Sequence, residues 1–372
     1  MHAEELISWL VLQSIDGVGD RTLHKLVQAF GSPDRVLTAP VEELRGAGCH
    51  ADLAAAIRQG PVAAIRRQID RQVALIDQLR ISVLSLSDSN YPKRLRTIHD
   101  PPPLLYCTGA LEERDDLAVA IVGGRAATDA GRAVTEEIAQ ELAQRGWTVV
   151  SGMARGIDAA AHRGALAGQG RTLAVLGCGL DRTYPPEHDR LRRQIEAHGA
   201  VVAELPVGAP PQTHHFPRRN RLISGLALGV LVAEAATNSG SLITAKLALE
   251  QGREVFAVPG SVKESQCRGS NGLIKAGAKL VETADDILED LLPQVEPGRC
   301  AEHGRAVHTH EASRSLDSDE QRIVAVLSRD ALSVDQVIAQ TGMNAAQVTA
   351  TLLALELAGR IRQLPGLHFV RR

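Results

Sequence analysis

Residues 117–128 read Leu-Ala-Val-Ala-Ile-Val-Gly-Gly-Arg-Ala-Ala-Thr, so six consecutive apolar residues lead directly into two glycines and an arginine. A continuous apolar run of this length is typical of a strand buried on both faces of a parallel sheet. Glycines directly after such a strand predict a tight turn at the carboxyl edge, where ligands of α/β proteins bind. This stretch therefore predicts an α/β fold and indicates which edge of the sheet carries the function.

The same pattern recurs through the central part of the chain. Further short apolar runs alternate with stretches of helical periodicity, and the runs cover residues 148–150, 172–176, 200–203, 229–233 and 254–258. Such strands separated by helices predict a parallel sheet with helices on both faces. We expect a Rossmann-like, doubly wound, mostly parallel sheet in residues 81–292, with 81–110 as a connecting segment that holds an edge strand.

Glycine and small polar residues follow five of the expected strands. Glycine lets a ligand approach the backbone closely, and the helix that follows offers free N–H groups to an anion. One such turn is weak evidence, since tight strand-to-helix turns also use glycine for geometry. Several in one sheet, together with Arg125 and Arg155, predict a row of phosphate contacts. The candidate residues of these turns are Gly123, Gly124, Ser151, Gly152, Gly156, Gly177, Gly179, Ser239, Gly240, Ser241 and Thr244.

A basic segment precedes another expected strand. Residues 214–225 read His-His-Phe-Pro-Arg-Arg-Asn-Arg-Leu-Ile-Ser-Gly, and the apolar run 226–233 follows at once. We expect a basic loop fixed to an interior strand. Arginine forks held beside an exposed aromatic ring suit a polymer of phosphates and bases. The candidates here are Phe216, Arg218, Arg219, Asn220 and Arg221, with Tyr184 as a second stacking residue.

Composition sets the class of protein. The chain has 372 residues, 44% of them hydrophobic, and a net charge of −3, which is ordinary for a soluble protein of two or three domains. A nearly neutral total argues against a protein that coats nucleic acid everywhere, but it allows a local basic groove. The five cysteines form no CxxC pair, and no signal peptide or membrane-length apolar run is present. We therefore expect free thiols, no membrane segment and a cytoplasmic location.

The flanking regions predict smaller modules. Residues 1–80 show helical periodicity interrupted by Gly17-Val18-Gly19, which fits a helix-hairpin-helix that presents amides to DNA, or a plain interhelical turn. Residues 293–315 are typical of a linker, and the spacing of its Cys300, His303, His308 and His310 matches no common metal site. Residues 316–372 predict three helices and a hairpin, which is a winged helix. Its third helix has no basic cluster, which favours a docking or accessory role.

Several enzyme classes lack their motifs here. The GxGxxG fingerprint and the Walker A motif are absent, which argues against nicotinamide enzymes and P-loop NTPases. Asp158 and His162 lie four residues apart on one helix face, as an acid/base pair or with Asp158 orienting the turn and His162 bonded to it. The second interpretation is favoured, because the sequence shows no nucleophile or metal partner. An adaptor that binds a nucleotide as a signal is a further alternative.

Six motifs occur in an order that resembles a known family. They are Ile121–Arg125, Ser151–His162, Gly177–Asp181 with Tyr184-Pro185, Phe216–Arg221, Ser239–Ser241 and Val258–Gly260. Together they closely resemble the DNA-processing protein A (DprA/Smf) family of bacteria over residues 81–290. A helical, SAM-like or helix-hairpin-helix amino-terminal region in residues 1–80 and a carboxyl-terminal winged helix also fit that family.

The resemblance implies a function. Members of the family bind single-stranded DNA without strong sequence preference and are not enzymes. They form homodimers through the Rossmann-like domain, protect incoming DNA and load the RecA recombinase onto it during natural transformation. The resemblance implies no cofactor and no metal. A nucleotide phosphoribohydrolase of the same fold class is the alternative, but its signature is poorly matched by residues 239–244, with Glu250 too far along the chain.

The resemblance also implies residue roles. The DNA-contacting arginine of the family falls on Arg125 and its aromatic residue on Phe216. Some members carry a lysine where this chain has Thr213, and others carry one where it has Pro186, which implies that the arginines listed above at 218, 219 and 221 neutralise more of the phosphate charge. We expect the backbone amides at 124, 152 and 240 to face successive phosphates.

Overall fold

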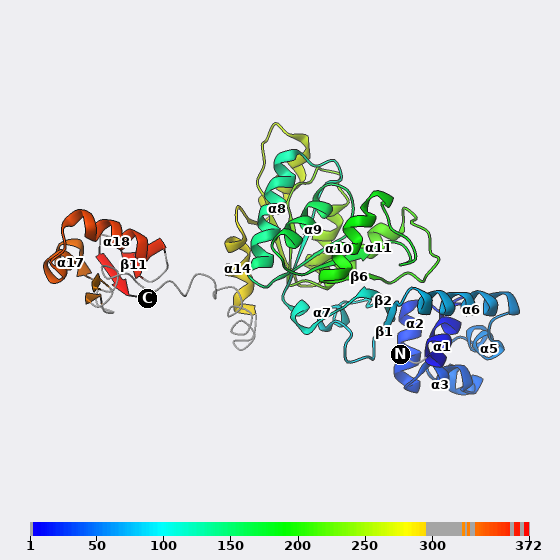
Figure 1. The fold of residues 1–372 in the computed structure, drawn as a ribbon. Helices are drawn as coiled ribbons and strands as arrows, with labels where there is room; N and C mark the ends of the chain where they lie inside the picture. Colours follow the sequence, from blue (N-terminus) through cyan, green and yellow to red (C-terminus); the bar gives the residue numbers. More distant parts are fainter. Residues whose placement is uncertain are drawn as a thin grey trace. The chain divides into compact units, whose positions relative to one another are not determined.

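The computed structural model describes residues 3–294, 322–323, 326–327, 332–357, 361–364 and 368–371. Its contacts divide the chain into two units, residues 1–307 and 308–372 (Figure 1). Most of the expected linker, including Cys300, His303, His308 and His310, lies outside the described residues.

A nine-stranded sheet forms the centre of the first unit. Its order is β1-β2-β6-β5-β4-β3-β7-β8-β9; β2 pairs antiparallel with β1 and β6, and the other pairs are parallel. This confirms the doubly wound, mostly parallel sheet. The strands are β1 (Ser82–Ser85), β2 (Leu104–Gly109), β3 (Ala118–Val122), β4 (Thr148–Ser151), β5 (Thr172–Leu176), β6 (Ala200–Ala203), β7 (Gly229–Val232), β8 (Glu254–Ala257) and β9 (Lys279–Leu280).

One expectation about the sheet was wrong. Residues 81–110 supply two strands rather than a connection with a single edge strand, and β2 lies inside the sheet between β1 and β6. The physical reason is burial, because Leu104, Leu105 and Tyr106 are at most 1% exposed and need neighbours on both sides. The three prolines at 101–103, directly before these residues, made the segment look like a connection rather than an interior strand in the sequence.

Helices cover both faces of the sheet. In β3, Val119 and Ile121 pack in one apolar cluster with α8, α9 and α14, whereas Ala120 and Val122 pack in another with α7, α11 and α12. Burial on both faces explains why the strands are continuously apolar. The helices are α7 (Lys93–Arg96), α8 (Asp129–Gln144), α9 (Ile157–Ala167), α10 (Asp189–His198), α11 (His215–Gly225), α12 (Ser241–Glu250), α13 (Arg268–Lys275) and α14 (Ala284–Leu291).

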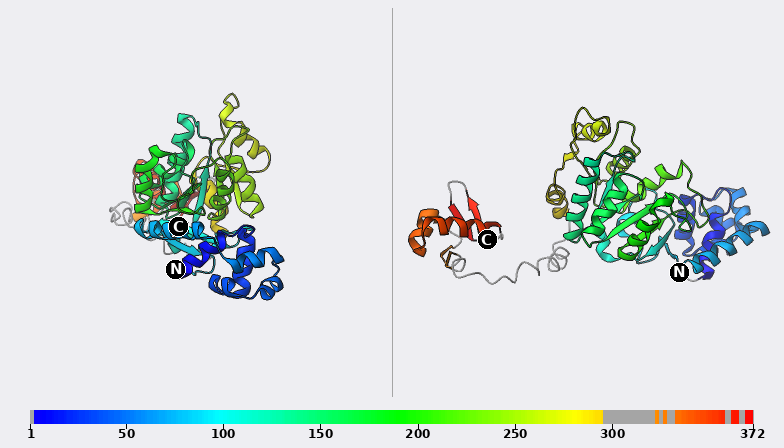
Figure 2. Two further views of the ribbon diagram at one scale, coloured as in Figure 1. Left: turned by 90° about the vertical axis from the view of Figure 1, so that its right-hand side faces the viewer. Right: turned by 45° about the horizontal axis from the view of Figure 1, so that its top comes forward.

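The amino-terminal region is helical, as expected, and packs onto the β1-β2-β6 end of the sheet (Figure 1 and Figure 2). Trp9 and Ile76 share one buried cluster with Tyr106 and Val207, so these helices and the sheet have a common core. The helices are α1 (Ala3–Gln13), α2 (Asp20–Phe30), α3 (Pro33–Thr38), α4 (Val41–Gly46), α5 (Ala51–Gln59) and α6 (Ala63–Gln78). Whether the turn between α1 and α2 receives DNA stays a prediction.

The second unit has the winged-helix elements. Helices α17 (Val334–Thr341) and α18 (Ala345–Leu357) pack with a three-stranded antiparallel sheet around Val337, Leu352 and Phe369. The strands are β10 (Leu332–Ser333), β11 (Ile361–Leu364) and β12 (His368–Arg371), in the order β10-β12-β11. The helix expected at 320–327 falls only partly within the described residues.

Two expectations from composition can be compared with the structure. The four described cysteines, Cys49, Cys107, Cys178 and Cys267, are buried free thiols. None of the helices in the described part of the chain has the length and apolar character that crossing a bilayer would require.

Candidate functional site

The order of the strands reverses between β3 and β7, since the chain runs from β3 to β4 on one side and returns to β7 on the other. A pocket of about 460 Å³ opens at the carboxyl edge beside this switch point, the place where open α/β sheets bind ligands. The pocket brings together predicted residues from four separate segments. These are Gly123, Arg125, Tyr184, Phe216, Arg219, Asn220, Ser239, Gly240, Ser241 and Thr244.

Two aromatic rings and a cation form the rim of this pocket. The ring centroids of Tyr184 and Phe216 are 5.4 Å apart with the planes inclined at 36°, and the Arg125 guanidinium lies 5.5 Å from the Phe216 centroid. Both rings are half-buried and Arg125 is exposed. Among the described residues no carboxylate forms an ion pair with Arg125. The rim therefore offers aromatic faces for stacking beside a positive charge that an anion can approach.

The basic segment is a helix, so the expectation of a basic loop was wrong. Residues 215–225 form α11, and the strand that follows, β7, begins at Gly229. Pro217 is tolerated because it lies in the first turn, where the backbone N–H has no partner within the helix. Leu222 and Ile223 are buried against the sheet and hold the helix there.

Burial also overturns the role expected for two arginines. Arg219 and Arg221 are each 5% exposed. Arg219 donates to the carbonyl oxygens of Gly152, at 2.9 Å, and of Val175. Arg221 forms ion pairs with Glu204 and, at 3.2 Å, with Asp100.

These guanidinium groups fasten α11 to the sheet, and they are not free to take over the charge of lysines absent at Thr213 and Pro186. Arg218 is exposed, but its charge is shared by Asp20 of α2, at 2.5 Å, and Glu204, at 3.3 Å. Asn220 braces the rim, because its side-chain amide donates to the carbonyl oxygen of Gly240 at 3.4 Å.

In most of the glycine-rich turns, the space beside the glycine is occupied by other groups of the protein. The Gly124 amide donates to the carbonyl oxygen of Glu234 at 2.7 Å, and a Cβ atom on Gly152 would lie 2.6 Å from the Arg219 guanidinium and 2.7 Å from the Asp158 carboxylate. A Cβ atom on Gly177 would lie 2.9 Å from the Phe216 ring. The expectation that amide 124 faces a phosphate was therefore wrong, because this amide already donates to Glu234. The expectation for amide 152 stays a prediction.

The turn before α12 differs from the others. A Cβ atom on Gly240 would meet nothing within 4 Å, so the backbone there is open. The hydroxyl groups of Ser239 and Ser241 lie 2.7 Å apart beside it, and Thr244 is buried one turn further along. An anion approaching the backbone could reach this turn.

The remaining predicted residues support the turns. The Ser151 hydroxyl is buried and donates to the carbonyl oxygen of Ile121 at 2.6 Å. Gly156 adopts φ +76°, and the Gly179 amide donates to the carbonyl oxygen of Ala209 at 2.9 Å. Arg155 is exposed but forms an ion pair with Glu187 at 2.5 Å, so these residues lie at the edge of the sheet without lining the pocket.

Asp158 and His162 do not form an acid/base pair. Asp158 orients the turn, as expected, by accepting from the Ala154 amide at 3.3 Å, and burial raises its pKa despite the nearby Arg219. His162 bonds instead to the Thr172 hydroxyl through Nδ1 at 2.7 Å, which corrects the expected bond to Asp158. Its Nε2 is buried without a partner among the described residues. Glu250, needed for the phosphoribohydrolase alternative, is exposed at the far end of α12 and does not line the pocket.

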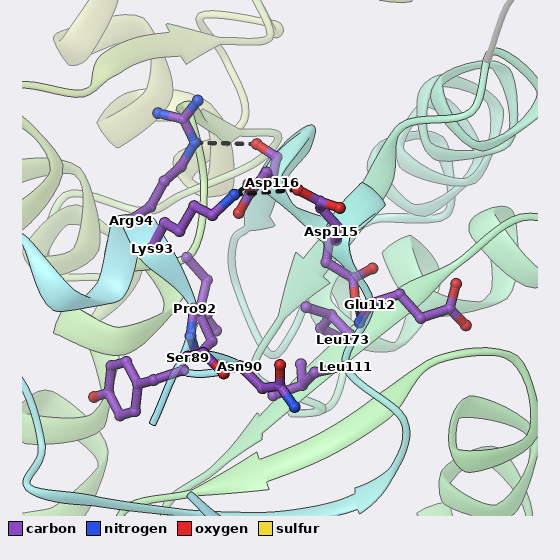
Figure 3. A pocket seen from close by; sticks show the side chains of 13 residues that line it. Ser89, Asn90, Pro92, Lys93, Arg94, Leu111, Glu112, Asp115, Asp116 and Leu173 are labelled. Carbon is purple, nitrogen blue, oxygen red and sulfur yellow. Dashed lines mark hydrogen bonds and ion pairs between the residues drawn. The ribbon is translucent and has the colours of Figure 1, made fainter. Parts of the chain in front are cut away.

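A second concavity, of about 270 Å³, lies at the opposite, amino edge of the sheet (Figure 3). Its charged side chains pair with one another. The Lys93 ammonium lies 3.2 Å from Glu113 and 3.6 Å from Asp116, and Arg94 donates to the carbonyl oxygen of Asp116 at 3.0 Å. Sequence reasoning selected none of these residues, and their mutual pairing leaves the carboxyl-edge pocket as the better candidate. Among the described residues no group of three potential metal ligands occurs.

The buried histidine makes stability depend on pH. Burial, with the charges of His188 and Arg219, lowers the pKa of His162 from its ordinary value near 6.5 to about 3. The unfolded chain therefore binds a proton below pH 6.5 that the folded chain does not, and stability falls as pH decreases from 6.5 toward 3. Between pH 7 and pH 5, the unfolding free energy of the parent should therefore fall by about 2 kcal/mol more than that of the His162→Gln variant.

Urea unfolding followed by tryptophan fluorescence measures this difference, since Trp9 and Trp147 are both buried in the first unit. The exposed His198, changed to Gln, is the matched control and should unfold like the parent at both pH values. Equal pH dependence of the parent and His162→Gln would contradict the assignment.

Comparison with known proteins shows the family of the chain. A family model described as DNA recombination-mediator protein A matches residues 82–292, and one described as DprA winged helix domain matches residues 308–366. Protein Smf of Synechocystis sp. is 35% identical over 406 residues that cover 100% of both chains. The DNA processing protein DprA of Streptococcus pneumoniae is 45% identical over 206 residues, which cover 55% of this chain and 73% of that one.

Solved structures extend the likeness to the fold. The X-ray structure of DprA from Streptococcus pneumoniae matches with a TM-score of 0.66 at 35% identity and covers 78% of this chain and 98% of that one. DNA processing protein A from Helicobacter pylori, described with a single-stranded DNA binding mode, matches with a TM-score of 0.53 at 32% identity, covering 58% and 98%. The sequence motifs, the fold and these matches together establish that the chain belongs to the DNA recombination-mediator protein A family.

Proposed function

We propose that this protein binds single-stranded DNA and that the pocket at the β3–β7 switch point receives the strand. One observation carries the proposal, namely the stack of Arg125, Phe216 and Tyr184 at the rim of that pocket. Stacking on aromatic rings tolerates any sequence because every base has a π face, and an adjacent cation attracts the backbone. The Helicobacter pylori relative described as binding single-stranded DNA supports the same ligand.

The distribution of charge suggests how the strand is held. Arg125 is exposed without an ion pair among the described residues, and the open backbone at Gly240 lines the same pocket beside two serine hydroxyl groups. Arg218 has carboxylate partners, and the other two arginines of α11 are buried. Stacking should therefore contribute a large share of the affinity, and the dependence of binding on salt should be shallow for a DNA-binding protein.

The wider role that we propose is mediation of recombination. In this role the protein protects incoming DNA by holding the strand in the pocket. It also loads RecA onto that DNA during natural transformation, as the resemblance of the motifs implies. This role belongs in the cytoplasm. We propose binding rather than catalysis, because Asp158 and His162 bond to other groups and do not form the pair that acid/base chemistry would need.

We also propose that the Rossmann-like domain forms a homodimer. At the β9 edge of the sheet Leu280 is 44% exposed, and Leu249 on α12, which packs against β8, is 63% exposed. Large apolar side chains on an edge strand and the helix beside it favour contact with another protein surface. A second copy related by a two-fold axis would bury both leucines on each subunit.

The rim stack gives the first test. We expect Phe216→Ala to weaken binding of an oligothymidylate by about 1–3 kcal/mol through lost stacking. Arg125→Ala should weaken it as well and make the slope of log K against log salt shallower by about 0.7, the value for one phosphate contact on a single strand. Fluorescence anisotropy at several salt concentrations measures both effects.

Arg145 provides the matched control, since it is a partly exposed arginine at the other end of α8 and pairs with Asp285 at 2.6 Å. Arg145→Ala should bind like the parent. Unchanged affinity and slope in the double variant of Arg125 and Phe216 would refute the site. Tight mononucleotide binding without oligonucleotide binding would support the adaptor instead, and release of free base from a nucleoside monophosphate would support the enzyme.

The dimer has its own test. Replacing Leu249 and Leu280 together by Glu should convert a dimer into a monomer in light scattering, because the carboxylates would be buried facing their symmetry mates. Val62 is 64% exposed in the amino-terminal region, so Val62→Glu serves as the control and should leave the mass unchanged. A monomeric parent, or a dimer that persists in the double variant, would contradict the proposal.

A further inference from the structure

The turn that carries Arg125 is held at both ends by Glu234, which lies two residues after the end of the neighbouring strand β7. At its start, the Gly124 amide donates to the backbone carbonyl of Glu234 at 2.7 Å. At its end, the Glu234 carboxylate accepts from the Thr128 amide at 2.9 Å and from the Thr128 hydroxyl at 2.5 Å. Arg125 and Ala126 lie between these anchors and are exposed.

The Glu234 carboxylate occupies the amino terminus of α8. Glu234 is 3% exposed, and within the described residues it forms no ion pair. Thr128 caps α8 by accepting from the Gly131 amide at 3.0 Å, and a Cβ atom on Gly131 would lie 2.3 Å from a carboxylate oxygen of Glu234. Helix amino termini stabilise anions, so the helix itself compensates this buried charge.

We propose that Glu234 is a positioning residue for Arg125, an inference that rests on the proposed function. Its three hydrogen bonds hold the turn so that the guanidinium stays over the Phe216 ring at the rim of the pocket. The same carboxylate fills the place at which a phosphate would otherwise meet the start of α8. The strand must therefore contact the Arg125 side chain rather than the terminus of the helix.

Two readouts test this role. In Glu234→Ala, hydrogen exchange of the peptide spanning residues 123–131 should accelerate, because the bonds to the Thr128 amide and hydroxyl are lost. Affinity for single-stranded DNA should fall in this variant as it does in Arg125→Ala. Adding Glu234→Ala to Arg125→Ala should lower the affinity by no more than about a further twofold, because both variants lose the same contact between Arg125 and the DNA. Glu234→Gln keeps an acceptor for the Thr128 amide and should restore most of the affinity.

Asp115 is the matched control, because it is a buried carboxylate at the opposite edge of the same sheet, paired with Arg171 at 2.8 Å. Asp115→Ala removes buried bonds too, but it should change neither the exchange of residues 123–131 nor the affinity for DNA.

Three results would overturn the proposal. They are unchanged exchange of the turn in Glu234→Ala, unchanged affinity in that variant while Arg125→Ala binds weakly, and a gain in affinity, which would mean that the carboxylate blocks a phosphate site. If Arg125→Ala itself bound DNA normally, the proposed function of this pocket would fail, and the exchange measurement would still decide whether Glu234 holds the turn.

Discussion

The buried guanidinium of Arg219 is the contact on which the pocket depends. It bonds to the carbonyl oxygens of Gly152, just after β4, and of Val175, in β5, and it lies near the buried Asp158. These bonds fix α11 across the ends of two strands. Phe216 lies one helical turn earlier and is thereby set against Gly177 and within 5.4 Å of Tyr184. A hydrogen bond to a charged group typically contributes about 1.5–3 kcal/mol, so these bonds stabilise α11 in this position.

This constraint changes the meaning of the small residues at the carboxyl edge. Gly152 makes room for Arg219 and Gly177 for the Phe216 ring, while the Gly124 amide is held by Glu234. The turns bring the side chains of the rim into place, and the ligand meets those side chains and the open backbone at Gly240. The fold thus uses glycine mainly to let its own elements approach each other closely.

The sequence predicted the sheet well for a clear physical reason. Strands buried on both faces must be apolar at every position, so residues 118–122 and their counterparts could be recognised without knowledge of their partners. The same rule did not reveal that β2 lies inside the sheet. The sequence also selected Arg125, from the turn after a strand, and Phe216, from the basic segment, and the structure places both at one pocket.

The role of the arginines on α11 could not be predicted from local sequence. One proline and three arginines at 217–221 indicate an exposed loop when the partners are unknown. The partners are carbonyl and carboxylate groups at 152, 175, 204 and 100, which are distant in sequence and come together only in the folded chain. Whether an arginine is buried thus depends on acceptors that no local pattern contains.

Ultraviolet crosslinking of the full-length protein to a single strand containing 5-iodouracil, with the crosslinked residues identified by mass spectrometry, tests the central claim most directly. We expect crosslinks to Tyr184 or Phe216, whose rings border the pocket. Crosslinks confined to residues outside the pocket, with none at either ring, would contradict it.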